Sequence, residues 1–177
     1  MLPDELVTVD NSAFRIAKKV FPGVPIVREN DFYKRKQIKQ IQKISCLTPN
    51  NLLYLTEPIR CRWLKKVKGE FQALNYFFEN IKNLNLPADA KVLIRLHPSE
   101  KNGKYNKLLR NKGQVKILPK KSNLYDNISQ SRWIAGCQTY AMVLGLESGR
   151  DVFCSLPPWA PNSALPHKKI VYLKEIQ

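Results

Sequence analysis

The sequence lacks several features that would place the protein in a well-marked class. No run approaches the roughly 18 consecutive apolar residues that a membrane-spanning helix needs. The N-terminus, MLPDELVTVD, is acidic and has no apolar segment, so it does not read as a secretory signal. Neither a Walker A loop nor a GxGxxG dinucleotide fingerprint occurs, and no internal repeat is visible.

The cysteines also lack the spacing of a metal site. The chain has four of them, without a CxxC pair or Cys/His ligand spacing: Cys46, Cys61, Cys137 and Cys154. We expect them to be reduced thiols in a cytoplasmic protein that needs no metal and no other cofactor. The sequence also shows no nucleophile–base–orienter set and no paired carboxylates of the glycosidase kind.

Acidic residues are few. Fourteen Asp and Glu stand against thirty Lys and Arg, which gives a formal net charge of +16. Such an excess favours anionic partners, whether a nucleic acid, a phosphorylated small molecule or an anionic membrane face. Aromatic residues do not alternate with the basic ones as a base-stacking surface requires, so a nucleic acid is the least favoured of these.

What the sequence does contain is an alternation of strands and helices. From residue 52 onward we expect the order β-α-β-α-β-α-β-α-β-β, with strands near 52–56, 91–96, 115–118, 132–135, 151–155 and 169–173. These strands are apolar along their length, as strands covered on both faces are. The pattern predicts an α/β fold with an open parallel sheet and helices on both faces.

Residues 1–48 have a different sequence pattern from the rest of the chain. We expect a strand at 5–9, a helix capped by Asn11 or Ser12, an extended stretch at 24–27 and a basic helix near 33–44. The basic face of that last helix is either an ordinary solvated surface or a contact for an anionic one. We therefore divide the chain into a βα piece with a basic helix, residues 1–48, and a main domain, residues 49–177.

Polar residues follow three of the expected strands. Thr56 and Glu57 end the first, His97 and Pro98 follow the second, and Gln138 with Thr139 lead from a later strand into a helix. In open parallel sheets, ligands bind at the carboxyl ends of the strands. These residues therefore predict a polar crevice at that edge.

Each of these side chains has two interpretations. His97 could bond a phosphate or sugar oxygen, or a backbone carbonyl at a strand end. Thr139 could help a helix N-terminus hold phosphate, or simply cap that helix. Glu57 could accept from sugar hydroxyls or tune a nearby cation, or serve as an ordinary loop carboxylate. Glu100, in the loop that follows His97, could hold a ribose hydroxyl.

The order of the motifs TEP, RLHP, GCQT and VFCSLPP resembles a glycosyltransferase. Over roughly residues 50–175 the chain is similar to the C-terminal, Rossmann-like donor-binding domain of GT-B enzymes. The similarity is greatest to bacterial sialyltransferases with an HP motif and to related capsule and surface-polysaccharide transferases. The resemblance implies that His97, as a catalytic group, and Pro98 contact the phosphate of a CMP-sugar. It also implies that Thr139, with Gln138 beside it, holds the donor phosphate.

The resemblance further implies a metal-independent transfer of a sugar from a nucleotide-activated donor, such as a CMP-sialic-acid-like one, to a surface glycan acceptor. Thr56, Glu57 and Glu100 would complete the donor site. The family's acceptor-activating acidic motif has no counterpart here, so an N-terminal partner domain or a homo-oligomer is implied, and this chain alone would be inactive. The basic helix would face that partner or the inner membrane surface. The alternative is a non-catalytic module that binds polyanions or nucleic acid.

Overall fold

The computed structural model describes residues 2–64 and 66–176, and the chain forms two compact units, residues 1–39 and 40–177. In the first unit, β1 (Leu6–Thr8) and β2 (Ile26–Arg28) pair in parallel and α1 (Asn11–Val20) connects them. The cap of α1 is Asp10, one residue before the expected position, because its carboxylate accepts the Ala13 N–H at 2.8 Å.

The basic helix is shorter than predicted. It is α2 (Phe32–Lys39), whereas the apolar spacing predicted a helix to residue 44. The backbone beyond it makes tertiary hydrogen bonds instead of helical ones. The Gln42 N–H donates to Ser129 Oγ at 2.9 Å, and the Gln42 carbonyl accepts from the guanidinium of buried Arg150 at 2.6 Å. These bonds hold the segment in a non-helical conformation.

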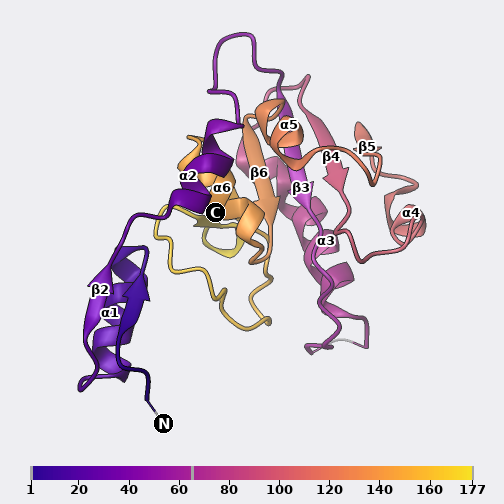
Figure 1. The fold of residues 1–177 in the computed structure, drawn as a ribbon. Coiled ribbons are helices and arrows are strands. Elements are labelled where there is room, and N and C mark those ends of the chain that lie inside the picture. Colours follow the sequence, from indigo (N-terminus) through magenta and orange to yellow (C-terminus); the bar gives the residue numbers. More distant parts are fainter. Residues whose placement is uncertain (1, 65, 177) are drawn as a thin grey trace. The chain divides into compact units, whose positions relative to one another are not determined.

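The second unit is built on a six-stranded parallel sheet, which confirms the predicted fold class. Its strand order is β5-β4-β3-β6-β7-β8, and every neighbouring pair is parallel. The strands are β3 (Asn51–Leu55), β4 (Lys91–Arg95), β5 (Val115–Ile117), β6 (Trp133–Gly136), β7 (Asp151–Cys154) and β8 (Val171–Tyr172) (Figure 1). This is the Rossmann order, which reverses direction between β3 and β6.

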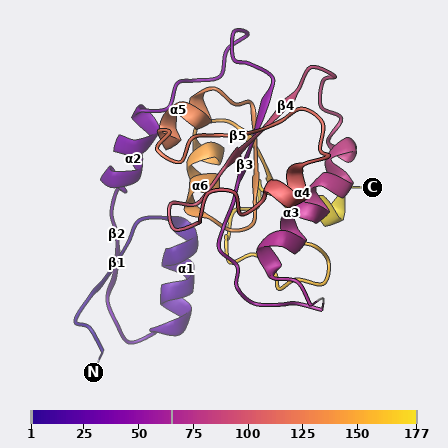
Figure 2. The same cartoon turned by 90° about the vertical axis from the view of Figure 1, so that its right-hand side faces the viewer.

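Helices cover both faces of this sheet. Figure 2 shows α3 and α4 on one side of the strands and α5 and α6 on the other. The helical segments are α3 (Gly69–Asn80), a 3₁₀ turn η1 (Ile81–Leu84), α4 (Asn106–Leu109), α5 (Leu124–Ser129), α6 (Tyr140–Glu147) and a second 3₁₀ turn η2 (Leu173–Glu175). None of the described helices has the length and apolar character to cross a bilayer.

Strand alternation divides the core between the two faces. Leu52 and Tyr54 of β3 pack with Leu74 and Phe77 of α3, and the rings of Tyr54 and Phe77 lie 4.8 Å apart. The intervening Leu53 points to the opposite face because successive side chains of a strand alternate. All five residues are 2% exposed or less, so both faces of β3 are buried from solvent.

Helix α6 ends at a glycine in the left-handed conformation. Gly149 has φ +85°, and its N–H donates to the Leu146 carbonyl at 3.1 Å. The Arg150 N–H donates to the Gly145 carbonyl at 3.0 Å, which completes a Schellman motif. The cap of α5 is Asn123, whose side chain accepts hydrogen bonds from two N–H groups of the first turn.

The packing of α6 against β6 can be tested at Gly145. A Cβ there would lie 2.2 Å from Cδ1 and 3.3 Å from Cγ1 of Ile134, whose side chain is fully buried. Overpacking costs about 1–3 kcal/mol, and the better helix propensity of alanine returns up to about 1 kcal/mol. We therefore expect urea denaturation to show Gly145→Ala less stable than wild type. Gly113→Ala, with nothing within 4 Å, should change stability by less than about 0.5 kcal/mol. A fully stable Gly145→Ala protein would contradict this packing.

Candidate functional site

The candidate site lies at the carboxyl ends of β3, β4 and β6, where the strand order reverses. A pocket of about 110 Å³ opens there, and its lining comes from four separate segments: Leu55, Thr56, Arg95, Leu96, His97, Pro98, Leu124 and Thr139. His97 and Thr139, which the sequence placed at neighbouring strand ends, therefore line one pocket. Their β-α junctions converge because β4 and β6 flank β3 in parallel register.

His97 is held by a tight turn. The Glu100 N–H donates to the His97 carbonyl at 2.9 Å, and the Glu100 carboxylate accepts the His97 N–H at 3.1 Å. Pro98 follows His97 in this turn, where proline supplies the required φ without losing a hydrogen bond. The Thr56 hydroxyl also accepts the His97 N–H, at 2.9 Å, so the end of β3 helps to position the turn.

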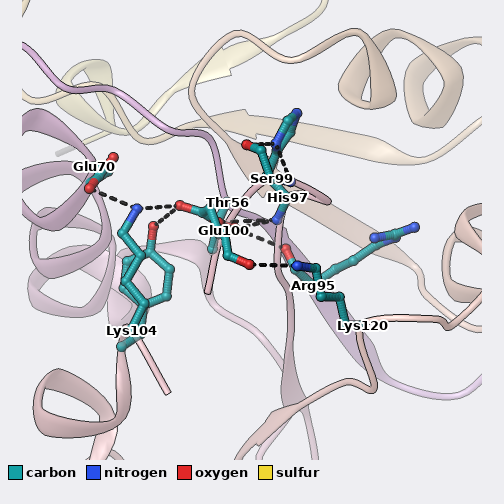
Figure 3. A network of polar contacts seen from close by, with 9 residues as sticks. Thr56, Glu70, Arg95, His97, Ser99, Glu100, Lys104 and Lys120 are labelled. Atoms are coloured by element: carbon teal, nitrogen blue, oxygen red, sulfur yellow. Dashed lines mark hydrogen bonds and ion pairs between the residues drawn. The ribbon is translucent and has the colours of Figure 1, made fainter. Parts of the chain in front are cut away.

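Glu100 is the centre of a buried polar network (Figure 3). It is only 3% exposed. One carboxylate oxygen accepts from Lys104 Nζ at 2.6 Å and from the Tyr105 hydroxyl at 2.6 Å, and the other accepts from the Thr56 hydroxyl and the His97 N–H. A carboxylate offers about four acceptor positions. All of them are taken, so in this structure Glu100 acts as a positioning residue for the turn and is not directed at a ligand.

The pKa of Glu100 reflects this network. Burial raises the pKa, but the hydrogen bonds from Lys104, Thr56 and Tyr105 and from the His97 N–H outweigh it, so the pKa lies below the ordinary 4.5. For Tyr105, burial and its bond to the same carboxylate raise the pKa of the phenol. The network therefore holds Glu100 ionised and Tyr105 protonated.

The imidazole of His97 has a defined orientation. Its Nδ1 accepts the Ser99 N–H at 3.2 Å, and the Ser99 hydroxyl lies 2.8 Å from the same atom. A backbone N–H can only donate, so the neutral ring carries its proton on Nε2. Within the described part of the chain, Nε2 has no hydrogen-bond partner. This N–H is available to a ligand oxygen.

Thr139 occupies the N-cap position of α6, but its side chain makes no capping hydrogen bond. Of the two interpretations of Thr139, the structure thus removes simple side-chain capping. The adjacent Gln138 N–H donates to the Glu57 carboxylate at 3.0 Å, and the Gln138 side chain accepts the Ala164 N–H at 3.2 Å. The Gln138 N–H is therefore already bonded to Glu57 and is not available to an anionic ligand.

Glu57 is electrostatically linked to the pocket. Burial raises its pKa, while the Gln138 N–H and the nearby imidazole of His97 act in the opposite direction without cancelling the effect. The carboxylate and the imidazole are close enough to interact, although Glu57 is not part of the pocket lining.

Arg95 is the site residue that sequence reasoning missed. It ends β4, lines the pocket and is half-buried, and burial lowers its pKa. Its guanidinium reaches the Leu96 and Ser122 carbonyls at 3.2 Å each, whereas its buried Nε has no partner in the described chain. In the sequence Arg95 looks like one polar residue within the strand KVLIRL. One signal in the sequence could have identified Arg95 as a site residue. It lies two residues before His97, on the opposite face of the strand from Ile94.

The buried thiols near the site are not nucleophiles. Burial raises the pKa of Cys137, which lies 3.8 Å from the Ser155 hydroxyl, and it raises the pKa of Cys154 to about 11. Both thiols are therefore protonated at neutral pH. Among the described residues no group of three His, Cys, Asp or Glu side chains is arranged to hold a metal ion.

The role of Glu100 predicts a specific pH dependence. Because its folded-state pKa lies below 4.5, its ionised form adds stability that is present above pH 4.5 and is lost as the pH falls through the folded-state value. Glu100→Gln should lower the free energy of unfolding at pH 7 by about 1–3 kcal/mol. Urea titrations at decreasing pH should show this gap between wild type and variant closing below pH 4.5.

Glu79→Gln is the matched control, because Glu79 is exposed on α3. Its difference from wild type should be small and nearly independent of pH. A gap for Glu100→Gln that stays constant from neutral to acidic pH would show that the carboxylate is not stabilised by its network.

No protein-family model and no curated protein matches this chain.

Proposed function

We propose that residues 40–177 bind the phosphate of a nucleotide-activated sugar and serve as the donor-binding part of a glycosyltransferase. One observation carries this proposal: His97 and Thr139 line the same pocket at the point where the strand order reverses. That position is where open α/β sheets bind their ligands.

The size of the pocket suits one phosphate-sized group. Its volume is about 110 Å³, and a cavity of about 150 Å³ is enough for a benzene molecule. Only the phosphate would be enclosed, and the nucleoside and sugar would extend from its mouth. The volume of the pocket therefore supports the phosphate site that the sequence motifs predict.

The donor groups at the pocket suit a phosphate as well. Three residues with hydrogen-bond donors are among those that line this space: Arg95 and His97 at the end of β4, and Thr139 at the start of α6. Hydrogen bonds that involve a charged partner are about twice as strong as neutral ones. The net charge of +16 favours the approach of an anion.

These groups could assist the transfer itself. When an acceptor hydroxyl attacks the anomeric carbon, the bond from that carbon to the phosphate oxygen breaks and negative charge grows on the phosphate. Donors already in place stabilise that charge without reorganisation. His97 would be the catalytic residue in this sense, and the group that removes the acceptor proton would come from a partner domain or a second copy.

The exposed surface of α2 is the part of the first unit that would meet a membrane. Phe32 and Tyr33 are each 71% exposed, and Arg35, Lys36 and Lys39 are exposed on the same short helix. Aromatic and basic side chains together suit an anionic bilayer surface. This would hold the protein at the inner membrane face, near a surface-glycan acceptor.

The proposal is tested by titrating the chain with CMP, UDP and GDP in a calorimeter. We expect at least one of them to bind with millimolar or tighter affinity, and we expect His97→Ala to weaken that binding about tenfold or more through the loss of a hydrogen bond to a charged group. The control is His167→Ala, since His167 is the only other histidine and lines a different pocket.

Two results would contradict the proposal. One is the absence of mononucleotide binding. The other is equal binding by His97→Ala and wild type. Binding of a mixed oligonucleotide alone, falling steeply with salt, would identify the polyanion-binding alternative instead.

A further inference from the structure

A second and larger pocket lies beside the turn of residues 97–100, the HP turn. Its volume is about 580 Å³, within the range of small-molecule sites. It is formed by residues that follow β3 and β4 and by the first turn of α3, and it shares only Ser99 and Glu100 with the turn that carries His97. The 110 Å³ pocket has a different lining, so the larger space can bind its own ligand.

The buried wall of this pocket has more negative than positive charge. Lys104 Nζ lies between two carboxylates, 2.7 Å from Glu70 Oε1 and 2.6 Å from Glu100 Oε1 (Figure 3). Two buried carboxylates thus share one ammonium group. The sum of these three charges is negative, and a second cation at this wall would neutralise it.

Glu70 has an acceptor atom to spare. Its residue is only 5% exposed, and its Oε2 is buried without a hydrogen-bond partner in the described chain. Glu100, by contrast, has all its acceptor positions taken. A buried carboxylate oxygen left without a donor is costly. Of the two carboxylates on this wall, Glu70 is therefore the one that lacks a hydrogen-bond donor.

The rim of the pocket has the opposite charge. Arg60, Lys68 and Lys101 line it, and all three are exposed. No acidic partner is within ion-pair distance of any of them in the described chain. Three positive groups around one opening favour a dianion such as phosphate over a singly charged carboxylate.

We propose that this pocket binds a small phosphorylated amine, with the ammonium group on Glu70 and the phosphate at Arg60, Lys68 and Lys101. The ligand would complete the charge balance of the wall at one end and that of the rim at the other. The site is separate from the proposed nucleotide pocket and does not depend on it.

The test compares glucosamine 6-phosphate with glucose 6-phosphate, which differ by one amine in place of a hydroxyl. We expect calorimetry to show glucosamine 6-phosphate binding about tenfold more tightly, because its ammonium group meets a buried carboxylate. Glu70→Gln should remove this preference while both sugar phosphates still bind weakly through the rim.

Exposed variants keep the test valid if Glu70→Gln fails to fold. Arg60→Ala should weaken both ligands about tenfold, whereas Arg62→Ala, an exposed arginine outside the lining, should not change either affinity.

Equal affinity for the two sugar phosphates would overturn the proposal, as would failure of both to bind at millimolar concentration. Equal losses in Arg60→Ala and Arg62→Ala would overturn it too, because they would show general attraction to a basic surface.

Discussion

The carboxylate of Glu100 is the constraint on which the candidate site depends. It binds the backbone of His97, the hydroxyl of Thr56 and the side chains of Lys104 and Tyr105. The ends of β3 and β4 are thereby joined to the segment that leads into α4. One buried charge sets the path of the HP turn, and residues of that turn line both pockets.

The sheet topology explains why polar groups gather at this edge. Strands on either side of the β3–β6 pair are added in opposite directions, so the loops that follow β3 and β6 diverge and leave a crevice. Thr139 enters it at the start of α6, and Arg95 and His97 enter it from the end of β4. The six parallel strands and the sealed core beneath them provide a rigid support for these side chains.

The strands and their polar ends were predictable because each is a local pattern. Apolar runs such as LLYL and VLIRL can be buried only in a covered sheet, and the polar residues after them had to meet at one edge. The end of the basic helix was less predictable. The end of α2 depends on Gln42 bonding to Ser129 and Arg150, which are distant in sequence, and no periodicity reports such bonds.

The roles of the acidic residues could not be predicted for the same reason. Glu100 was interpreted as a ligand for a sugar hydroxyl, but its donors come from three separate segments that meet only in the fold. Glu70 looks like an ordinary acidic residue in the first turn of a helix, and only the structure shows its buried, unpaired oxygen. Sequence reasoning located the edge of the sheet, whereas the partners of each charge required coordinates.

The central claim is that His97 and Thr139 hold the same phosphate, and a double-mutant cycle on CMP binding tests it most directly. His97→Ala, Thr139→Val and the double variant are compared with wild type by calorimetry. If both side chains contact one phosphate, their effects are coupled by about 0.5 kcal/mol or more. Effects that add to within about 0.3 kcal/mol would show two independent sites and contradict the account.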